Sequence, residues 1–374
     1  MDISYAILKG VKESQLINKG DRILVGVSGG IDSVVLLDIL ARLKEELGLS
    51  IHAAHVNYGL RGKESDRDEK FVRGLAKEYD IPCVIARNKA TKPVCRQAGN
   101  LPRVNLQNSA RELRYDFFLK TAKKIKAGKI AVAHHADDQA ETVLLHLIRG
   151  SGLSGLVGMT HTSSPPLMGG DKGEGGIVLI RPLLSFTKNG LLAYAKERGL
   201  KFVQDRTNRT KKYHRNVIRH ELLPLLRKYN PNVIERVCKT AAILRDENEA
   251  LDEIAARAFL QSSGHVCHPR ESGNDKRIIH KVKFNRLRFI KHHIAIRRRI
   301  LRLAYAKLTG GTADLLNDHI ERMLQIIGSA KKEGEYSLPN GVKFIRKGDA
   351  IILSVGHLLK KIGDKCPTLS KNIG

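Results

Sequence analysis

The sequence predicts an α/β protein in which a doubly wound parallel sheet is followed by a smaller helical and α+β domain. Apolar segments of strand length alternate with segments of helical apolar spacing as far as about residue 203, the order typical of a parallel sheet. Near residue 215 the strand patterns stop and helical patterns follow. We therefore expect the sheet domain over residues 1–215, a helical and α+β domain over 216–356, and a short basic tail over 357–374.

The elements of the sheet domain are predicted from their apolar periodicity. Arg22 to Val27 is apolar enough for a buried parallel strand, and apolar residues repeat at helical spacing from Val34 to Leu47. The same patterns predict strands at Ile51–Asn57, Pro82–Arg87, Lys129–Ala133, Ile177–Ile180 and Lys201–Val203, and helices at Glu64–Tyr79, Asn108 or Ser109 to Ala127, Asp137–Arg149 and Thr187–Arg198. Residues 88–104 and 160–176 lack such periodicity and are expected to be surface loops.

The last third of the chain combines helices with a β-hairpin. Helical spacing continues from about residue 215 to about Gly264, and a polar loop follows at 262–276. Further along, two strand-like segments between Gly334 and Ser354 flank Asn340-Gly341, a pair that favours a tight hairpin turn. This part of the chain therefore predicts a second, smaller α+β domain.

The composition favours a polyanionic partner. Lysine and arginine total 66 against 38 acidic residues, a net charge of +28, so nucleic acid is the leading candidate. No run of about 18 apolar residues is present, and the amino terminus lacks a basic region before an apolar one, so neither a membrane span nor export is predicted. The five cysteines form no Cys-x-x-Cys pair, which argues against a zinc ribbon and fits a cytoplasmic protein.

A turn of small residues follows the first strand. In Ser28-Gly29-Gly30-Ile31-Asp32-Ser33, two adjacent glycines let the backbone approach an anion, and the amides of the next helix point outward. No lysine follows the glycines, which distinguishes this turn from the Gly-Lys-Ser/Thr phosphate loop. Because Asp32 brings a negative charge instead, we expect a polyphosphate bound together with Mg²⁺.

Polar residues also follow the second and fourth strands, where the ligand of a doubly wound sheet lies. His55 begins one such segment, and His134, His135, Asp137 and Asp138 form the other. Capping of the next helix needs only one of the two acids, and Glu141 lies three residues beyond Asp138 on the same helix face. We therefore expect one carboxylate to hold Mg²⁺ and another to orient or deprotonate an amine.

A metal-dependent phosphohydrolase is an alternative interpretation of this histidine-rich segment. His134, His135, Asp137, Asp138 and His146 supply the residue types that such a site uses. The alternative leaves the Ser28–Ser33 turn without a role, and two adjacent histidines cannot easily face one metal from a strand end. It is therefore the weaker interpretation.

Arginines provide the remaining candidate contacts. Arg111 and Arg114 share a helix face and can clamp a phosphate group, although pairing with Glu112 and Asp116 is the ordinary alternative. Two further runs of basic residues contain no acid and favour a phosphate backbone as partner. Within these runs, 206–220 and 280–307, the expected contacts with nucleic-acid phosphates are Arg206, Arg209, Lys211, Lys212, Arg215, Arg219, Arg297, Arg298 and Arg299.

Taken in order, these motifs resemble the tRNA(Ile)-lysidine synthetases of the PP-loop ATP pyrophosphatase superfamily. The Ser28–Ser33 turn alone indicates only the superfamily. The segments that resemble the narrower family are His55 to Arg61, Ala110 to Tyr115, His134 to Thr142 with Arg149 to Gly152, and Asp205 to Arg219.

The resemblance implies that ATP adenylates the wobble cytidine of a tRNA(Ile) with a CAU anticodon, and that free L-lysine then displaces AMP. It implies ATP and Mg²⁺ as cofactors, and a homodimer is kept open as the assembly. Under this hypothesis the nucleotide contacts are Ser28, Gly29, Gly30, Ile31, Asp32, Ser33, His55, His134 and His135, and Mg²⁺ lies on Asp32 and Asp137. The catalytic residues implied are Asp32, Asp137, Asp138, Glu141, Arg111 and Arg114, with Asp138 and Glu141 binding and deprotonating the lysine amine.

Two other functions share some of these features. A tRNA-thiolating enzyme of the same superfamily would use sulfur as the nucleophile, and Cys83 and Cys95 are the thiols nearest to the expected site. A tRNA-binding protein without catalytic activity would need only the basic runs. ATP cleavage that depends on tRNA would exclude the second of these.

Overall fold

The structure is a computed structural model, and it describes residues 2–59, 62–87, 106–165, 176–203, 214–264, 281–312 and 314–355. The chain forms two compact units, Met1–Asp246 and Glu247–Gly374. The first unit extends past the boundary expected at residue 215, because Ile218, Leu223 and Ile234 pack on Ala136 and Ala140. The tail expected over 357–374 lies outside the described residues.

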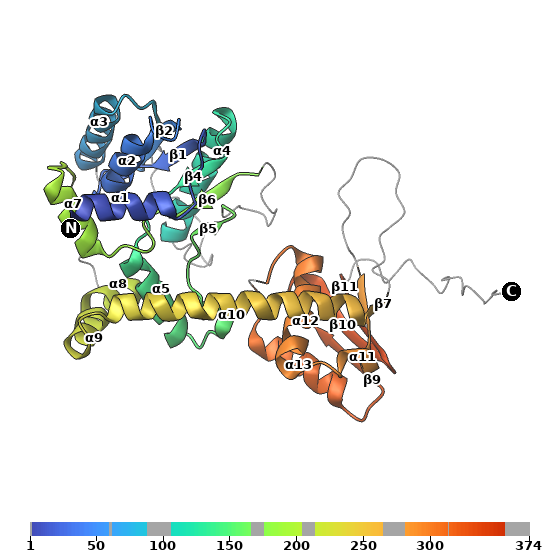
Figure 1. Ribbon diagram of the computed structural model, residues 1–374. Helices are drawn as coiled ribbons and strands as arrows, with labels where there is room; N and C mark the ends of the chain where they lie inside the picture. The colour runs from blue at the N-terminus through green and yellow to red at the C-terminus, as the bar shows by residue number, and fades with distance from the viewer. Residues whose placement is uncertain are drawn as a thin grey trace. The chain divides into compact units, whose positions relative to one another are not determined.

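A six-stranded sheet organises the first unit (Figure 1). Its strand order is β3-β2-β1-β4-β6-β5, and only β5 runs antiparallel to its neighbour. The strands are β1 (Arg22–Gly26), β2 (Ser50–Asn57), β3 (Cys83–Arg87), β4 (Lys129–Ala131), β5 (Thr162–Ser163) and β6 (Val178–Ile180). The prediction of a doubly wound, mostly parallel sheet is confirmed.

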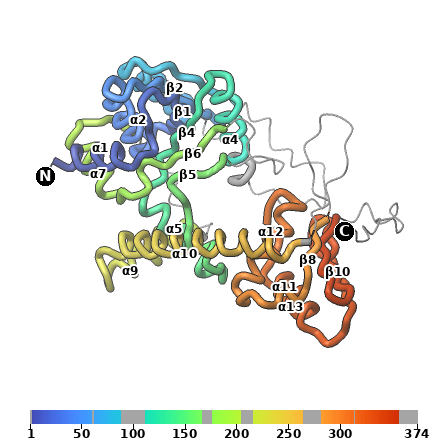
Figure 2. The backbone as a smooth tube through the Cα atoms, turned by 45° about the vertical axis from the view of Figure 1, so that its right-hand side comes forward, coloured from blue at the N-terminus to red at the C-terminus, as the bar shows by residue number. Residues whose placement is uncertain are grey.

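Helices cover both faces of this sheet. One face packs on α1 (Ile3–Glu13), α2 (Ile31–Leu43), α3 (Lys63–Glu78) and α7 (Lys188–Glu197), which share one apolar core. The opposite face packs on α4 (Leu106–Lys124) through Tyr115, Phe118 and Leu119. Figure 2 shows the sheet between α2 and α4. The remaining helices of the unit are α5 (Ala136–Ile148), α6 (Leu153–Leu156), α8 (His214–Val217), η2 (Ile218–Leu222), α9 (Leu223–Tyr229) and the first part of α10 (Val233–Ser262).

Several predicted segments differ from the structure. Within the surface loop expected over 160–176, Thr162 and Ser163 form β5 and pair with β6. The prediction of a strand at Lys201–Val203 is wrong, since these residues have no regular secondary structure. The amide of Val203 donates instead to the carbonyl of Gly29, at 2.9 Å, so the segment is bonded to the Ser28–Ser33 turn rather than to the sheet. Helix α4 begins at Leu106, before the cap expected at Asn108 or Ser109. The loop expected over 88–104 lies outside the described residues.

The second unit contains a five-stranded antiparallel sheet with the order β7-β8-β11-β10-β9. The predicted hairpin is confirmed, because β9 and β10 pair and Asn340 and Gly341 between them adopt the positive φ angles of 58° and 70°. Its strands are β7 (Ser263–Gly264), β8 (Lys281–Asn285), β9 (Glu333–Ser337), β10 (Val342–Lys347) and β11 (Ala350–Val355). Its helices are α11 (Arg286–Phe289), α12 (Ile294–Thr309), α13 (Asn317–Gly328) and the end of α10, and η3 (Pro339–Gly341) forms the hairpin turn.

A buried carboxylate joins three elements of the first unit. Asp38 on α2 is fully buried and accepts hydrogen bonds from the hydroxyls of Tyr79, at 2.7 Å, and Tyr194, at 2.5 Å. Arg198 lies 3.5 Å from the same carboxylate and provides the opposite charge. Burial and the nearby carboxylate both raise the pKa of the two tyrosines, so their hydroxyls stay protonated and donate.

Replacing Asp38 with alanine should therefore destabilise the protein by about 1–3 kcal/mol for each hydroxyl left without an acceptor. Tyr79→Phe, which removes a single hydrogen bond, should cost only about 1 kcal/mol. Urea unfolding followed by circular dichroism measures both. A loss for Asp38→Ala no larger than that for Tyr79→Phe would contradict the role of this carboxylate.

Candidate active site

The Ser28–Ser33 turn is held in shape by its own side chains. Gly29 has a φ of +88°, which a residue with a Cβ rarely adopts. The hydroxyl of Ser33 donates to the carbonyl of Gly30, at 2.8 Å, so it must accept from the Ser28 amide and the Ser28 hydroxyl, both at 3.1 Å. Helix α2 begins directly at Ile31, so the free amides of its first turn are available to bind an anion beside the Ser28–Ser33 turn.

His55 fixes the start of this turn from the neighbouring strand. Its Nδ1 lies 2.8 Å from the carbonyl oxygen of Val27, which can only accept, so Nδ1 carries a proton and donates. The side chain is buried at the end of β2. His55 therefore has a structural role, since it positions the backbone that leads into Ser28. Its contact with a nucleotide stays a prediction.

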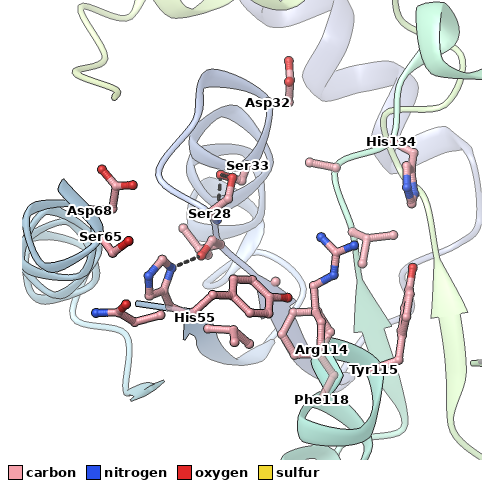
Figure 3. Close-up of a pocket in the computed structure, with 17 residues that line it drawn as sticks. Ser28, Asp32, Ser33, His55, Ser65, Asp68, Arg114, Tyr115, Phe118 and His134 are labelled. Carbon is pink, nitrogen blue, oxygen red and sulfur yellow. Dashed lines mark hydrogen bonds between the residues drawn. The ribbon is translucent and has the colours of Figure 1, made fainter. Parts of the chain in front are cut away.

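A cavity of about 510 Å³ opens beside the turn, within the size range of ligand sites. Of the residues predicted to bind or transform the nucleotide, Ser28, Asp32, Ser33, His55, Arg114 and His134 line this cavity. Figure 3 shows Ser65 and Asp68 of α3 on one side of the turn and Arg114, Tyr115 and Phe118 of α4 on the other. Ile31, which was also predicted to contact the nucleotide, does not line the cavity. Its side chain is buried in the apolar core between the sheet and helices α1, α2, α3 and α7.

Three carboxylates surround the buried imidazole of His135. Its Nε2 lies 3.8 Å from an oxygen of Asp32 and 3.4 Å from one of Asp138, and its Nδ1 lies 3.7 Å from one of Asp137. The backbone amide of His135 also donates to Asp138, at 3.2 Å, so Asp138 caps α5 as one of the two acids was expected to do. His135 thereby connects the Ser28–Ser33 turn to the start of α5.

Cations from distant parts of the chain balance two of these acids. The ammonium of Lys188 lies 2.5 Å from Asp32, and the backbone amide of Lys188 donates to Asp137, at 2.7 Å. Arg227 also binds Asp137, at 3.1 Å. Sequence reasoning missed Lys188, although one signal was available: it is the first residue of α7, where the helix dipole disfavours a positive charge.

Arg215 and Arg219 bind the other pair of predicted catalytic acids. Glu141 is almost fully buried and accepts from Arg215 at 2.9 Å and from Arg219 at 2.5 Å. The same arginines lie 3.3 and 3.1 Å from Asp138. Burial raises the pKa of Asp138, but His135 and Arg215 outweigh it and hold this pKa below its usual value. Asp138 is therefore a carboxylate that stays ionised and is a weak acceptor of protons.

The two predicted arginines of α4, Arg111 and Arg114, are exposed, and Arg114 lines the cavity. The guanidiniums of Arg111 and Arg114 lie 5.6 and 5.8 Å from the centre of the Tyr115 ring, close enough for a cation–π interaction. Asp116, the neighbour considered for surface pairing, binds Lys120 at 2.7 Å instead. This arrangement fits the clamp predicted for an anion.

The donor set fits Mg²⁺ bound jointly by protein and nucleotide. Within the described residues, no three His, Cys, Asp or Glu side chains are arranged to hold a metal by themselves. Mg²⁺ commonly uses only one or two carboxylates together with substrate phosphates. Asp32 belongs to the turn, and Asp137 lies near it because both carboxylates contact the imidazole of His135. His146, which the phosphohydrolase interpretation would use, has its Nδ1 2.6 Å from the carbonyl oxygen of Gly155 and belongs to no group of three such side chains within the described residues.

The predicted tRNA contacts are distributed between described and undescribed segments. Arg206, Arg209, Lys211 and Lys212 lie outside the described residues. In the second unit Arg298 binds Glu321 at 2.6 Å, and Arg299 binds Asp252 and Asn248. Arg297 of the same helix has a buried Nε for which the structure shows no hydrogen-bond partner. Contact of these residues with RNA stays a prediction.

Comparison with known proteins identifies the family of the chain. The PP-loop domain family matches residues 3–226. The tRNA(Ile)-lysidine synthase of Clostridioides difficile (strain 630) is 33% identical over 93% of this chain and 70% of its own length. That of Geobacter sulfurreducens is 36% identical over 91% of this chain and 67% of its own length. The chain belongs to the tRNA(Ile)-lysidine synthase family.

Other comparisons set the limits of this family assignment. The family's enzyme from Dehalococcoides mccartyi is 37% identical over 86% of this chain, which spans only 64% of that relative. Among solved structures, a U34-tRNA thiolase from Methanococcus maripaludis with its 4Fe-4S cluster matches with a TM-score of 0.52 and 19% identity, over 65% of this chain and 79% of its own. This likeness concerns the fold alone. In the described part of the chain no helix has the length and apolar character to cross a membrane.

The site predicts a loss of stability in mild acid. Burial lowers the pKa of His134 to about 4, and Arg181, Arg215 and Arg114 contribute to the lowering while Asp138 opposes it. Between the unfolded value of 6.5 and the folded value of about 4, the unfolded chain binds a proton that the folded chain does not. Stability should therefore fall as the pH decreases through this window.

Urea unfolding of the wild type and of His134→Gln at several pH values between 4 and 7 tests this. The variant should show a shallower loss of stability than the wild type. Equal slopes for the two proteins would show that His134 does not remain neutral in the folded state.

Proposed function

We propose that this chain ligates lysine to C2 of the wobble cytidine of a CAU-anticodon tRNA(Ile), in the cytoplasm, through an adenylated cytidine. The observation that carries the proposal is the connection between two adjacent sites. The cavity beside the Ser28–Ser33 turn suits a nucleotide, and His135 joins Asp32 of that turn to the acids of α5. A reaction that activates a base with ATP and then adds an amine needs these two sites within reach of one another.

Activation of the cytidine uses the turn and the arginines. The amides of Gly29, Gly30 and the first turn of α2 bind the pyrophosphate that leaves, and the Ser28–Ser33 hydrogen bonds keep the turn in its binding shape. Arg111 and Arg114 offset charge near the α-phosphate. Asp32 and Asp137 would hold Mg²⁺, which neutralises phosphate oxygens when it is bound.

Transfer of lysine uses Asp138 and Glu141. The pKa of Asp138 is held low, so Asp138 pairs with the lysine ammonium. We assign removal of the ammonium proton to Glu141, which leaves the neutral amine that attacks C2 while AMP departs. Glu141 is buried against Arg215 and Arg219. An ammonium that binds Glu141 therefore has to replace one of these guanidiniums, and the phosphates of the RNA offer the displaced arginine a new partner.

The thiolation alternative finds less support in the same region. Burial raises the pKa of Cys83, so its thiol stays protonated and is a poor nucleophile. Cys95 lies outside the described residues. Lysine transfer also gives the α5 acids a task that sulfur transfer does not require.

The direct test incubates the protein with ATP, Mg²⁺, labelled lysine and a CAU-anticodon tRNA(Ile) transcript. We expect label in the RNA, together with AMP and pyrophosphate in equal amounts. A transcript with G in place of C34 is the control, because it offers no cytidine for activation. A folded protein that leaves the RNA unlabelled would overturn the proposal.

The role of Asp138 is tested by Asp138→Asn, which keeps the size of the side chain and removes its charge. Lysine incorporation at limiting lysine should fall by about tenfold or more, because a charge-assisted bond to the ammonium is lost, whereas pyrophosphate release with the tRNA should persist. Asp116→Asn is the matched control, since Asp116 pairs with Lys120 on the surface of α4 and its loss should leave incorporation unchanged. Near-normal lysine transfer by folded Asp138→Asn would refute the assignment.

A further inference from the structure

Lys188 lies at the candidate active site, in the first turn of α7, where a positive charge is unfavourable for the helix. It begins α7, and Thr187 caps that helix by accepting from the amide of Gly190 at 3.2 Å. A positive charge in the first turn opposes the helix dipole. The position is therefore stabilised by groups outside the helix, and those groups are Asp32 and Asp137.

The backbone and the side chain of Lys188 have different degrees of freedom. Its amide is held by Asp137, at 2.7 Å, so the start of the side chain is fixed. The side chain itself is about one-third exposed, and the four-carbon stem of lysine allows its ammonium to reach several positions. The backbone of Lys188 is therefore held in place, while its charged ammonium group can move.

The partner of that charge belongs to the Ser28–Ser33 turn. Asp32 lies in the first turn of α2, beside the amides expected to bind pyrophosphate, and it lines the nucleotide cavity. The same carboxylate is one of the two proposed Mg²⁺ ligands. In the structure the ammonium of Lys188 neutralises Asp32 at a distance of 2.5 Å.

We propose that Lys188 is a phosphate-binding residue that exchanges Asp32 for the pyrophosphate part of ATP when the nucleotide and its metal bind. The Ser28–Ser33 turn lacks the lysine of other phosphate loops, and the fold supplies one from 156 residues further along the chain. Release of Asp32 makes its carboxylate available to a cation at the moment that the ammonium gains phosphate oxygens. This inference rests on the proposed use of ATP with Mg²⁺.

The exchange predicts opposite effects of one substitution on two ligands. In the full-length protein, Lys188→Met removes the competing ammonium from Asp32, so Mn²⁺ without nucleotide, followed by electron paramagnetic resonance, should bind severalfold more tightly. Binding of the Mg²⁺ complex of the α,β-methylene analogue of ATP should weaken by about tenfold or more, because a charge-assisted bond is lost. AMP, which lacks the β- and γ-phosphates, should bind as tightly as to the wild type.

Two further variants separate a specific role from a general disturbance. Lys188→Arg keeps the charge and should recover most of the affinity for the ATP analogue. Lys196→Met, the same substitution at an exposed position of α7, should change none of the three affinities.

Equal weakening of AMP and ATP-analogue binding by Lys188→Met would indicate a structural role and overturn the inference, as would unchanged binding of the analogue or of Mn²⁺. Should Lys188→Met fail to fold, Lys188→Gln takes its place in the same measurements. These assays do not involve lysine or tRNA, so a wild type that binds ATP without making lysidine would refute the proposed function and leave this inference standing.

Discussion

Negative charge gathered around one buried imidazole is the constraint on which the first unit depends. Asp32, Asp137 and Asp138 all approach His135, and each stands in the first turn of α2 or α5, where the helix dipole favours an acid. Their charge is balanced by cations from α7, α8, η2 and α9, namely Lys188, Arg215, Arg219 and Arg227. These ion pairs therefore also join α7, α8, η2 and α9 to the first turns of α2 and α5.

This balance explains how many charged side chains can be buried around one imidazole. Isolated buried charges are costly, so each buried acid needs a protein cation and each buried guanidinium needs a protein acid. Glu141 illustrates the point, because it is almost fully buried and contacts two guanidiniums. A group that replaces one member of such an ion pair keeps the other member compensated, and the displaced member then needs a new partner.

The basic runs that contain no acidic residue in the sequence lie beside acidic residues from other segments in the structure. The run over 280–307 contains no Asp or Glu, yet Arg298 and Arg299 of α12 bind Glu321 of α13 and Asp252 of α10. In the earlier run, Arg219 binds Glu141. A count along the chain sees only neighbours within a few residues, whereas salt bridges join residues from separate helices. The net charge of +28 nevertheless predicts a polyanionic partner, because it sums over the whole molecule.

The sequence by itself determined the features that depend on local periodicity and spacing: the parallel sheet, the Ser28–Ser33 turn, the polar segments at the ends of β2 and β4, and the hairpin at Asn340-Gly341. Apolar repeats and glycine conformation act over a few residues, so they can be recognised in a linear pattern. Only the tertiary structure decided which charges meet. Lys188 reaches Asp32, and Val203 bonds to Gly29 instead of joining the sheet, because packing of α7 and its neighbours brings together residues far apart in the chain.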